Sequence, residues 1–433
     1  MHIAVIGTGY VGLVTGACFA DFGMRVTCVD KDEAKIASIK AGQMPIYEPG
    51  LDALVAKNVR EGRLDFSTDL RSTVAQSLVV FLAVGTPPSG DGSADMSQID
   101  EVAFEIAKAL NGYKVIVTKS TVPVGAASRI KKIIEENRAT ASRFSVAANP
   151  EFLREGAAIN DFMRPDRVVI GCTDEEAIAI LKDIYRPLYL IETPFVITTA
   201  ESAEMIKYAS NAFLATKVSF INEIARLCEL LGADVHDVAK GMGMDVRIGS
   251  KFLHPGPGFG GSCFPKDAKA LVALGRSVNY DVRIVEAALF VNDQQRQSII
   301  ERVMRLVPQL EGKTIAILGL AFKPETDDIR EAPALKIIED LLNRGAKVRA
   351  YDPAAMETAR RILAGIEYCE DEYEAARGSD VLVVVTEWNQ FRRLDMPRLK
   401  EVMREPNIVD LRNIYEPETM RSEGFNYLGM GRN

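Results

Sequence analysis

The sequence predicts an α/β protein with two doubly wound parallel-sheet domains joined by a long central helix and a helical region. Three observations indicate this fold. Short apolar, β-branched runs alternate with helical patterns at the start of the chain, a long helical pattern fills the middle, and the alternation restarts near Lys313. Such alternation is typical of parallel βαβ units.

Residues 1–195 are predicted to form the first domain. Its strand runs are IAVI, RVTCVD, LVVFLAV, KVIVTK, FSVAA and RVVIG. These runs are apolar at successive positions rather than alternate ones. The pattern suits parallel strands in a sheet that helices cover on both faces.

Residues 196–310 are predicted to be helical. From Ala200 the run ESAEMIKYASNAFLATKVSFINEIARLCELLG reads as one helix. At about 1.5 Å per residue this helix exceeds roughly 40 Å. That length suits a connector between two domains or a surface that pairs with a second subunit. Further helical patterns occur in KDAKALVAL and after Asp281.

Residues 311–433 are predicted to form a second domain of the same type. KTIAILGLAF, a helical stretch from Leu335 to Arg344 and KVRAYDP repeat the order at the N-terminus: strand, glycine turn, helix, and strand ending in Asp. Later strands are DVLVVVTEW and NIVDLRN. We interpret the repeat as a weak internal duplication of a Rossmann-like unit.

Composition argues against several classes of function. The 433 residues are 47% hydrophobic and 26% charged, which is typical of globular domains and not of disorder. Sixty acidic and 52 basic residues give a net charge of -8, so nucleic acid is not an expected partner. The only histidines are His2, His236 and His254, and we expect no metal site.

The cysteines and the N-terminus indicate the compartment. Six cysteines without a C-x-x-C pair favour a reducing environment. The opening MHIAVIGTGYVG enters a strand pattern at once, which is unlike a signal peptide. No window approaches the roughly 18 to 20 apolar residues of a membrane span. We therefore expect a cytoplasmic protein without a membrane partner.

Gly7, Gly9 and Gly12 form a G-x-G-x-x-G motif directly after a strand and at the start of a helix. Glycines there allow a tight turn and the close approach of a pyrophosphate to the helix N-terminus. Asp30 ends the next strand, where an acid accepts hydrogen bonds from an adenosine ribose. The alternative is a turn that only packs helix on strand. Because a 2′-phosphate would meet the Asp30 carboxylate, we predict NAD and not NADP.

Cys263 is the candidate nucleophile. It follows the shaped loop HPGPGFGGS and precedes Lys266 and the expected start of a helix. A nearby cation and a helix N-terminus both favour the thiolate. The other five cysteines are interpreted as small buried hydrophobic residues.

Two further pairs carry little information when each is taken alone. Lys207 and Asn211 are four residues apart and share a helix face, whose default interpretation is a solvated surface. Glu151 and Glu155 in NPEFLREG have the same spacing, and a capping or surface acid pair is the default there. The hydroxyl cluster in KSTVPVG at 119–125 is equally ordinary alone.

Eight segments taken together, in chain order, resemble the UDP-glucose/GDP-mannose dehydrogenase family over essentially the whole chain. They are GTGYVG at 7–12, YEPGL at 47–51, VGTPP at 84–88, KSTVPVG at 119–125, NPEFLREG at 149–156, K-x-x-x-N at 207–211, GFGGSCFPKD at 258–267 and GLAFKPETDDIRE at 319–331. The resemblance implies an N-terminal NAD domain, a helical dimerisation region and a C-terminal nucleotide-sugar domain.

The resemblance also implies a four-electron oxidation of UDP-glucose at C6 to UDP-glucuronate with two NAD. Cys263 would form a thiohemiacetal and then a thioester. Lys207 and Asn211 would stabilise oxyanion charge. Asp267 and Thr121 would orient a water or the reacting hydroxyl, and Glu151 would act as a base toward the hydrolytic water. The division of proton-transfer roles among these groups stays open.

Binding residues are implied in the same way. The cofactor contacts are Gly7, Gly9, Tyr10, Val11, Gly12, Asp30, Lys35, Thr86, Thr121, Glu155, Lys266 and Arg330. The substrate contacts are Glu151, Phe152, Leu153, Arg154, Glu155, Lys207, Asn211, Phe252, Leu253, His254, Pro255, Gly256, Gly260 and Lys323. Arg247, in DVRIG, would reach the substrate of the adjacent subunit in a homodimer or higher homo-oligomer.

Three alternatives stay open. The same chemistry on GDP-mannose or a UDP-N-acetylhexosamine would share the catalytic set and differ in base and sugar contacts. A non-catalytic NAD-binding sensor would bind the cofactor without turnover, and the joint presence of Cys263, Lys207, Asn211 and Asp267 argues against it. A two-electron 3-hydroxyacid dehydrogenase would need neither the thiol nor a second nucleotide-binding domain.

Overall fold

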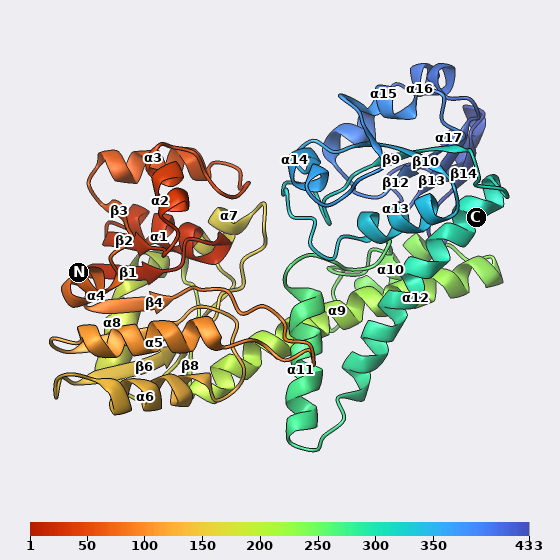
Figure 1. Ribbon diagram of the computed structural model, residues 1–433. Coiled ribbons are helices and arrows are strands. Elements are labelled where there is room, and N and C mark those ends of the chain that lie inside the picture. The colour runs from red at the N-terminus through yellow and green to blue at the C-terminus, as the bar shows by residue number, and fades with distance from the viewer. Residues whose placement is uncertain (433) are drawn as a thin grey trace. The chain divides into compact units, whose positions relative to one another are not determined.

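The computed structural model of the protein describes residues 1–432. The chain divides into two compact units, of which the first comprises residues 1–210 and 269–277 and the second residues 211–268 and those from 278 onward. Each unit contains a largely parallel sheet, and one long helix carries the chain from the first unit into the second. The predicted fold class is confirmed (Figure 1).

The first unit is built on a sheet of strand order β3-β2-β1-β4-β5-β6-β7-β8. Its strands are β1 (His2–Ile6), β2 (Arg25–Val29), β3 (Leu64–Ser67), β4 (Val79–Leu82), β5 (Lys114–Thr118), β6 (Phe144–Ala148), β7 (Val168–Gly171) and β8 (Phe195–Thr198). Its helices are α1 (Tyr10–Asp21), α2 (Glu33–Lys40), α3 (Leu51–Arg60), α4 (Leu70–Gln76), α5 (Ser97–Ala109), α6 (Ala126–Asn137), α7 (Ala158–Met163) and α8 (Glu175–Ile184), with a 3-10 turn at Arg186–Ile191.

One strand prediction is wrong in direction. The pattern of RVVIG predicts a parallel strand, but β7 pairs with β6 in antiparallel fashion, through Ala148 and Gly171. β8, which the strand patterns did not reveal, pairs with β7 in parallel. A parallel return needs a crossover, usually a helix of some length. The segment between β6 and β7 contains only the short α7, and it carries the NPEFLREG residues past the strand ends.

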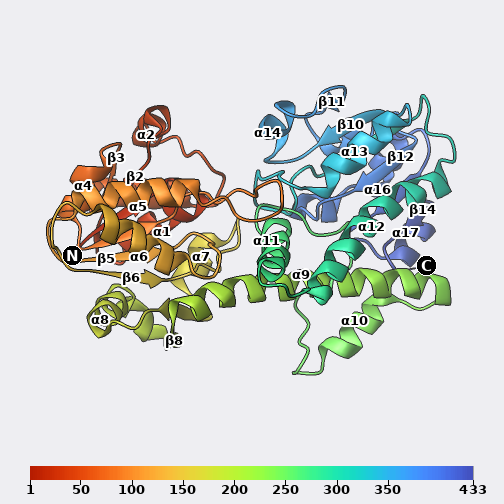
Figure 2. The ribbon, with the colours of Figure 1, turned by 60° about the horizontal axis from the view of Figure 1, so that its bottom comes forward.

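Successive residues of the central strands point into two separate apolar layers. Ile3 and Val5 of β1 pack in a core with α1, α3 and α8, whereas Ala4 and Ile6 pack in a core with α4, α5 and α6. Helices α5 and α6 lie side by side on this second face (Figures 1 and 2). The continuous apolar character of these strands follows from this double coverage.

The long central helix is α9 (Ala200–Leu231), with 32 residues. At about 1.5 Å per residue it is about 48 Å long. The boundary between the units falls between Ser210 and Asn211, inside this helix. The helices that follow are α10 (Val235–Gly243), α11 (Phe264–Ser277) and α12 (Arg283–Leu306).

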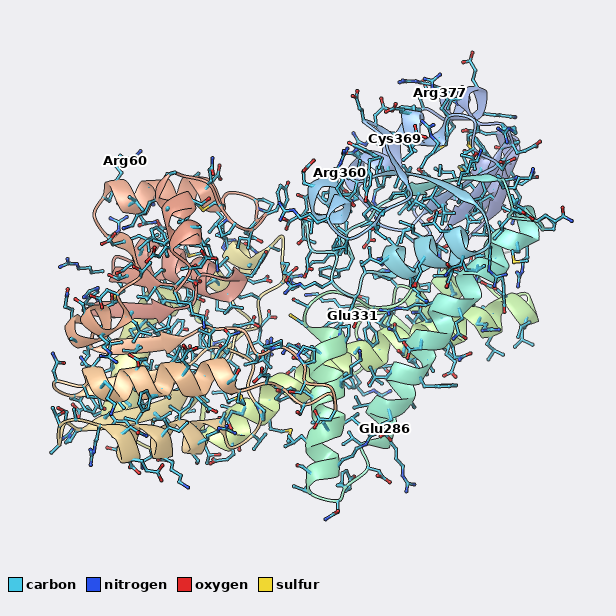
Figure 3. All side chains as sticks on the ribbon, viewed as in Figure 1. Arg60, Glu286, Glu331, Arg360, Cys369 and Arg377 are labelled. Atoms are coloured by element: carbon cyan, nitrogen blue, oxygen red, sulfur yellow. The ribbon has the colours of Figure 1, made fainter. Side chains whose placement is uncertain are left out.

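The second unit contains a parallel sheet of order β11-β10-β9-β12-β13-β14. Its strands are β9 (Thr314–Leu318), β10 (Lys347–Tyr351), β11 (Glu367–Tyr368), β12 (Val381–Val384), β13 (Asn407–Asp410) and β14 (Asn426–Leu428). Its further helices are α13 (Pro333–Asn343), α14 (Met356–Arg360), α15 (Glu372–Ala376), α16 (Met396–Val402) and α17 (Pro417–Ser422), with a 3-10 turn at Asn389–Arg393. Arg360 and Arg377, at or beside helix ends, are exposed (Figure 3).

Asp352 is the counterpart of Asp30 in the repeat, but its carboxylate is fully occupied by the protein. It is 1% exposed. Its Oδ2 accepts hydrogen bonds from the N–H groups of Leu320 and Ala321 and from the Trp388 indole, and its Oδ1 accepts from the N–H groups of Ala354 and Ala355. Asp352 therefore closes the turn after β9 onto β10.

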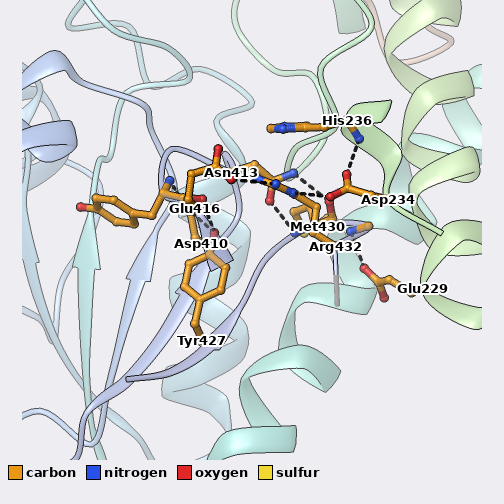
Figure 4. A network of polar contacts seen from close by, with 11 residues as sticks. Glu229, Asp234, His236, Asp410, Asn413, Glu416, Tyr427, Met430 and Arg432 are labelled. Atoms are coloured by element: carbon orange, nitrogen blue, oxygen red, sulfur yellow. Dashed lines mark hydrogen bonds and ion pairs between the residues drawn. The ribbon is translucent and has the colours of Figure 1, made fainter. Parts of the chain in front are cut away.

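The C-terminal segment is tied down by a polar network (Figure 4). Arg432 pairs with Asp234, the N-cap of α10, at 3.0 Å and with Glu416 at 2.9 Å. Asn413 exchanges two hydrogen bonds with the backbone of Met430. These contacts join the last residues to α10 and to the loop after β13. Among residues 1–432, no helix combines the length and the apolar character needed to cross a bilayer.

Candidate active site

A cavity of about 370 Å³ opens in the first unit beside the carboxyl ends of β1 and β4. The strand order reverses between these two strands, which is where doubly wound sheets bind ligands. Gly7, Gly9, Asp30, Lys35 and Gly85 are among its lining residues. The G-x-G-x-x-G motif and Asp30, separated along the chain, thus line one cavity.

The three motif glycines have different reasons to be glycine. Gly7 has a φ of 101°, and a Cβ there would lie 2.6 Å from the Ala83 carbonyl oxygen. A Cβ on Gly12 would meet the Gly7 oxygen at 1.9 Å, so Gly12 serves the packing of α1 on the turn. A Cβ on Gly9 meets no protein atom within 4 Å, and Gly9 lines the cavity. A bound group therefore explains Gly9 better than the packing-only alternative.

Asp30 is held ionised and oriented at the cavity wall. Its Oδ2 accepts hydrogen bonds from the Thr8 N–H at 3.0 Å, the Thr8 hydroxyl at 2.7 Å and the Lys35 ammonium at 2.8 Å. Although burial raises the pKa of Asp30, these donors outweigh it and lower the pKa to about 2. Lys35, an implied cofactor contact, thus lies beside the acid. These residues fit the adenosine ribose of a dinucleotide.

Tyr10 ties three of the sequence motifs together. Its hydroxyl donates to Glu48 in YEPGL and accepts a hydrogen bond from the Gly156 N–H in NPEFLREG at 2.6 Å. Glu48 also accepts hydrogen bonds from the N–H groups of Gly156 and Ile159. Burial raises the pKa of Tyr10 far above its usual range. The structure thus gives Tyr10 a structural tie in addition to its implied cofactor contact.

Glu151 and Lys207 form a buried ion pair, with 2.8 Å between Oε1 and Nζ. They are 5% and 3% exposed, so the default interpretation as surface groups is wrong for both. The Phe152 ring centroid lies 5.4 Å from the Lys207 Nζ, and the Leu153 N–H donates to Glu151. The pair places a cation and a carboxylate side by side in a water-poor setting.

Lys119, at the end of β5, is a second buried lysine near this pair. Its Nζ donates to Asn149 Oδ1 at 3.0 Å and to the Tyr185 hydroxyl at 3.1 Å. Burial lowers the pKa of Lys119 to about 7, with Glu151 acting to raise it and Lys207 to lower it. Lys119 is therefore electrostatically coupled to both members of the pair.

Thr121 lies in the loop between β5 and α6, and its backbone is anchored to the loop after β4. The Thr86 hydroxyl donates to the Thr121 carbonyl at 2.8 Å, and the Ser120 hydroxyl donates to the Val84 carbonyl at 2.6 Å. A small cavity of about 10 Å³ is lined by Thr121, Lys207 and neighbouring residues. Two implied catalytic side chains of the first unit therefore border one small cavity.

In the second unit, Cys263 occupies the N-terminal end of α11. Its carbonyl accepts the hydrogen bond of the Asp267 N–H at 2.8 Å, as an N-cap residue does. The helix N-terminus favours negative charge at this end. Cys263 is partly exposed, whereas the five other free cysteines are buried, as predicted. Of the six thiols, that of Cys263 is the most accessible to a reactant.

Asp267, one turn into α11, contacts one implied catalytic residue and one implied cofactor contact. Its Oδ2 accepts from the Asn211 amide at 2.6 Å, and its Oδ1 accepts from the Lys266 ammonium at 2.7 Å. Asp267 is 1% exposed, and Asn211 is also buried. Asn211 follows Lys207 by four residues in α9 and so belongs to the same helix face.

The glycine-rich loop before Cys263 is clamped by amide side chains. Asn292 of α12 accepts from the Phe259 N–H at 2.7 Å and donates to the Phe259 carbonyl. The Gly256 backbone donates to Asn222 and accepts from Gln295. A Cβ on Gly260 would meet the Glu331 carbonyl oxygen at 2.3 Å. The loop is therefore held in one shape from both sides.

The remaining implied binding residues are placed as follows. Phe252 has a φ of 65°, Leu253, Pro255 and Gly256 are buried, and His254 is exposed. Arg247 is exposed and pairs with Asp245, Arg330 pairs with Asp328, and Arg154 pairs with Asp161. Lys323 lies over the Phe322 ring, Glu155 is buried, and Val11 is partly buried.

Sequence patterns alone assign no role to Glu48, Lys119, Glu204 or Arg412. Glu48 lies in the YEPGL segment and Lys119 in the KSTVPVG segment, so a local signal exists for these two. Arg412 donates to the Phe322 carbonyl at 3.0 Å and to the Val385 carbonyl at 2.7 Å, and it follows a strand run without any motif. No group of three or more His, Cys, Asp or Glu suited to a metal ion occurs in the described part of the chain.

Comparisons with known proteins agree with this geometry. Residues 1–189 match the NAD binding domain of the UDP-glucose/GDP-mannose dehydrogenase family, residues 201–294 its central domain, and residues 316–417 its UDP binding domain. The chain is 54% identical to a UDP-glucose 6-dehydrogenase of Rhizobium meliloti over 436 residues, covering 100% of both proteins.

Solved structures of nucleotide-sugar dehydrogenases are similar to this chain over its whole length. A UDP-glucose dehydrogenase from the archaeon Pyrobaculum islandicum superposes with a TM-score of 0.93 at 38% identity, covering 100% of this chain and 98% of that one. A UDP-D-ManNAc dehydrogenase from Pyrococcus horikoshii superposes with a TM-score of 0.87 at 27% identity, covering 100% and 99%. With a dinucleotide cavity in the first unit, a partly exposed thiol at a helix N-terminus in the second, and all three family domains matched in order, the chain belongs to the UDP-glucose/GDP-mannose dehydrogenase family.

Proposed function

We propose that the protein is a UDP-glucose 6-dehydrogenase, most like the bacterial enzymes, which oxidises the C6 alcohol of UDP-glucose to the carboxylate of UDP-glucuronate with two NAD. The observation that carries the proposal is Cys263 at the start of α11, one turn before an Asp267 that holds Asn211 and Lys266. A two-electron dehydrogenase has no use for a nucleophilic thiol beside such a cluster.

The overall reaction consumes one water and two NAD for each alcohol and yields a carboxylate, two NADH and three protons. NAD supplies the hydride acceptor in both oxidations. The first unit supplies the matching residues: Gly7 makes the tight turn, Gly9 leaves room for the pyrophosphate, and the Asp30 carboxylate accepts hydrogen bonds from the ribose hydroxyls. Lys35, Thr86, Thr121, Glu155, Lys266 and Arg330 are proposed as further cofactor contacts.

Cys263 makes the second oxidation possible. After the first hydride leaves C6, the thiolate adds to the aldehyde carbon and the carbonyl oxygen takes up a proton, giving a thiohemiacetal. Loss of a hydride and a proton then leaves a thioester. Lys207 and Asn211, which follow each other by one turn of α9, stabilise negative charge on the oxygen of C6.

Hydrolysis of the thioester regenerates the thiol. We assign Glu151 as the base that takes a proton from the attacking water, with its carboxylate held by Lys207. Asp267 and Thr121 orient a water or the reacting hydroxyl. The water oxygen bonds to C6, the C–S bond breaks, and the leaving thiolate is again at the helix N-terminus, which favours its charge.

The sugar nucleotide is proposed to contact residues 151–155, the loop from Phe252 to Gly260, Lys207, Asn211 and Lys323. The match to a UDP binding domain and the identity to a UDP-glucose 6-dehydrogenase favour UDP-glucose over GDP-mannose or a UDP-N-acetylhexosamine. One of the similar solved structures is a UDP-D-ManNAc dehydrogenase, so a UDP-N-acetylhexosamine is the second candidate substrate.

Counting NADH tests the proposal. With a panel of UDP- and GDP-sugars, we expect the fastest turnover with UDP-glucose and two NADH for each sugar consumed. One NADH for each sugar would indicate a two-electron dehydrogenase. NAD binding without turnover on any sugar would indicate a sensor, and faster turnover with another nucleotide sugar would reassign the substrate.

We further propose a homodimer or higher homo-oligomer in the cytoplasm that supplies UDP-glucuronate for polysaccharide synthesis. Large apolar side chains on α9, including Phe213, Phe220 and Leu230, are exposed in the single chain, as is Phe290 of α12. Exposed apolar patches of this kind are typical of protein interfaces. Free cysteines throughout fit a reducing compartment.

A further inference from the structure

Helix α6 begins without a capping side chain of its own. Its N-cap residue, Gly125, has a left-handed φ of 97° and no side chain, and its first turn contains no acidic residue. The cap comes instead from Glu204 of α9, 79 residues further along the chain. Glu204 Oε2 accepts from the Gly125 N–H at 2.7 Å, and Oε1 accepts from the Ala127 N–H at 2.9 Å. Both carboxylate oxygens are used.

This carboxylate is deeply buried, at 3% exposed. Burial raises the pKa of Glu204 to about 7, while the Gly125 and Ala127 N–H groups act to lower it. A serine at the N-cap would cap α6 without placing a carboxylate in such a setting. The cost of burying Glu204 suggests that its position on α9 has a use beyond capping.

Helix α9, which supplies the cap of α6 through Glu204, also carries Lys207. Glu204 and Lys207 are three residues apart and share a face of α9. Both line the small cavity of about 10 Å³ that Thr121 also lines. The loop with Thr121 is fixed by Thr86 and Ser120 at one end and by Glu204 at the other. Glu204 thus ties the end of the loop that contains Thr121 to the helix that carries Lys207.

We propose that Glu204 is a positioning residue, which sets the Thr121 loop against Lys207 by capping α6 from α9. The inference rests on the proposed function, because it assigns both side chains to the same reaction. Displacing a catalytic group by about 1 Å can cost up to about 100-fold in rate. The loss should appear in kcat, because Glu204 is not among the residues that line the cofactor cavity of the first unit.

The test compares Glu204→Gln with Glu201→Gln, since Glu201 is an exposed glutamate one turn earlier on the same helix. The glutamine retains one acceptor oxygen and the size of the side chain. We expect kcat with UDP-glucose to fall at least about tenfold in Glu204→Gln and to stay unchanged in Glu201→Gln. Glu204→Asp, which keeps the charge, should recover part of kcat.

A double-mutant cycle with Thr121→Ala separates positioning from general damage. If Glu204 acts through Thr121, the double variant loses little more than the worse single variant. Amide exchange at residues 125–127 should quicken in Glu204→Gln and not in Glu201→Gln, while circular dichroism shows both variants folded.

Two results would overturn the inference. The first is parental kcat in a folded Glu204→Gln whose melting temperature alone has dropped. The second is a double variant in which the two rate losses multiply. A parent protein that reduces no NAD with any sugar of the panel would instead refute the proposed function, and this inference with it.

Discussion

Glu151 and Lys207 are 56 residues apart in the chain and yet share a buried ion pair of 2.8 Å. Breaking a buried pair by removing one partner leaves an uncompensated charge and costs about 3–5 kcal/mol. Lys207→Met should therefore lower the free energy of unfolding by that amount, and kcat by at least about 100-fold.

Denaturant melts and steady-state rates measure both effects. Lys132→Met, in the exposed pair with Glu136 on α6, is the control and should cost less than about 1 kcal/mol. In the double variant Lys207→Met with Glu151→Leu, stability should return and activity should not. Equal stability losses in the two lysine variants would contradict the buried pair.

Asp30 should decide the cofactor. Its carboxylate faces the cavity, so a 2′-phosphate would meet a negative charge, and kcat/KM should be much higher with NAD than with NADP. Asp30→Asn should shrink that preference by at least about tenfold, or about 1.4 kcal/mol. Glu33→Gln, an exposed acid on α2, is the control. Equal efficiency of the parent with both cofactors would refute the assignment.

Cys263→Ser should bind NAD like the parent but fail in steady turnover. An ester hydrolyses less readily than a thioester, so a sugar adduct on the serine should accumulate and be visible by mass spectrometry. Iodoacetamide should modify Cys263 selectively, and UDP-glucose should protect it. Cys172→Ala, at a buried thiol, is the control and should keep the parental kcat. Two NADH per sugar at the parental rate from Cys263→Ser would rule out the thiol as nucleophile.

Arg247 should complete the site of the adjacent subunit. Its side chain is 85% exposed in the single chain and forms an ion pair with Asp245. Arg247→Ala and Cys263→Ala should each be inactive, and mixing them should restore one site in each heterodimer, or about a quarter of the parental rate after random exchange. A mixture of Cys263→Ala with Cys263→Ser should stay inactive. No recovery despite verified subunit exchange would argue against a shared site.

Lys119 should make stability depend on pH. Its folded pKa is about 7 against an ordinary 10.5, so between these values the unfolded chain binds the extra proton. Stability therefore rises with pH across this window, by up to about 1.4 kcal/mol per pH unit. In Lys119→Met this rise should vanish, and in the exposed Lys131→Met it should persist. Parallel pH curves for the parent and Lys119→Met would contradict a neutralised lysine.

The parts that could be predicted from sequence are those with local signals. The dinucleotide cavity can be predicted because a strand, a turn and a helix follow one another within about 30 residues, which include Gly7, Gly9, Gly12 and Asp30. The length of α9 follows from its unbroken helical pattern. The burial of five cysteines follows from their apolar neighbours.

The parts that could not be predicted depend on distant pairing. The i,i+4 spacing of Lys207 and Asn211 fits a surface as well as a core, and only the partners Glu151 and Asp267 decide between them. The cap of α6 by Glu204 has no local signal, because donor and acceptor are 79 residues apart. The direction of β7 depends on the path of the chain after β6, which the apolar pattern of the strand does not encode.

The hydrogen bonds of Asp352 limit where the protein can bind NAD. The Asp352 carboxylate accepts hydrogen bonds from four backbone N–H groups and from the Trp388 indole. Unlike that of Asp30, it is therefore not available to a ribose. The two NAD molecules that the proposed reaction consumes must then bind one after the other at the same site in the first unit. In the proposed reaction, the first NADH has to leave and a second NAD has to bind while the sugar is held on Cys263 as a thiohemiacetal, so this intermediate must outlive the exchange of cofactors.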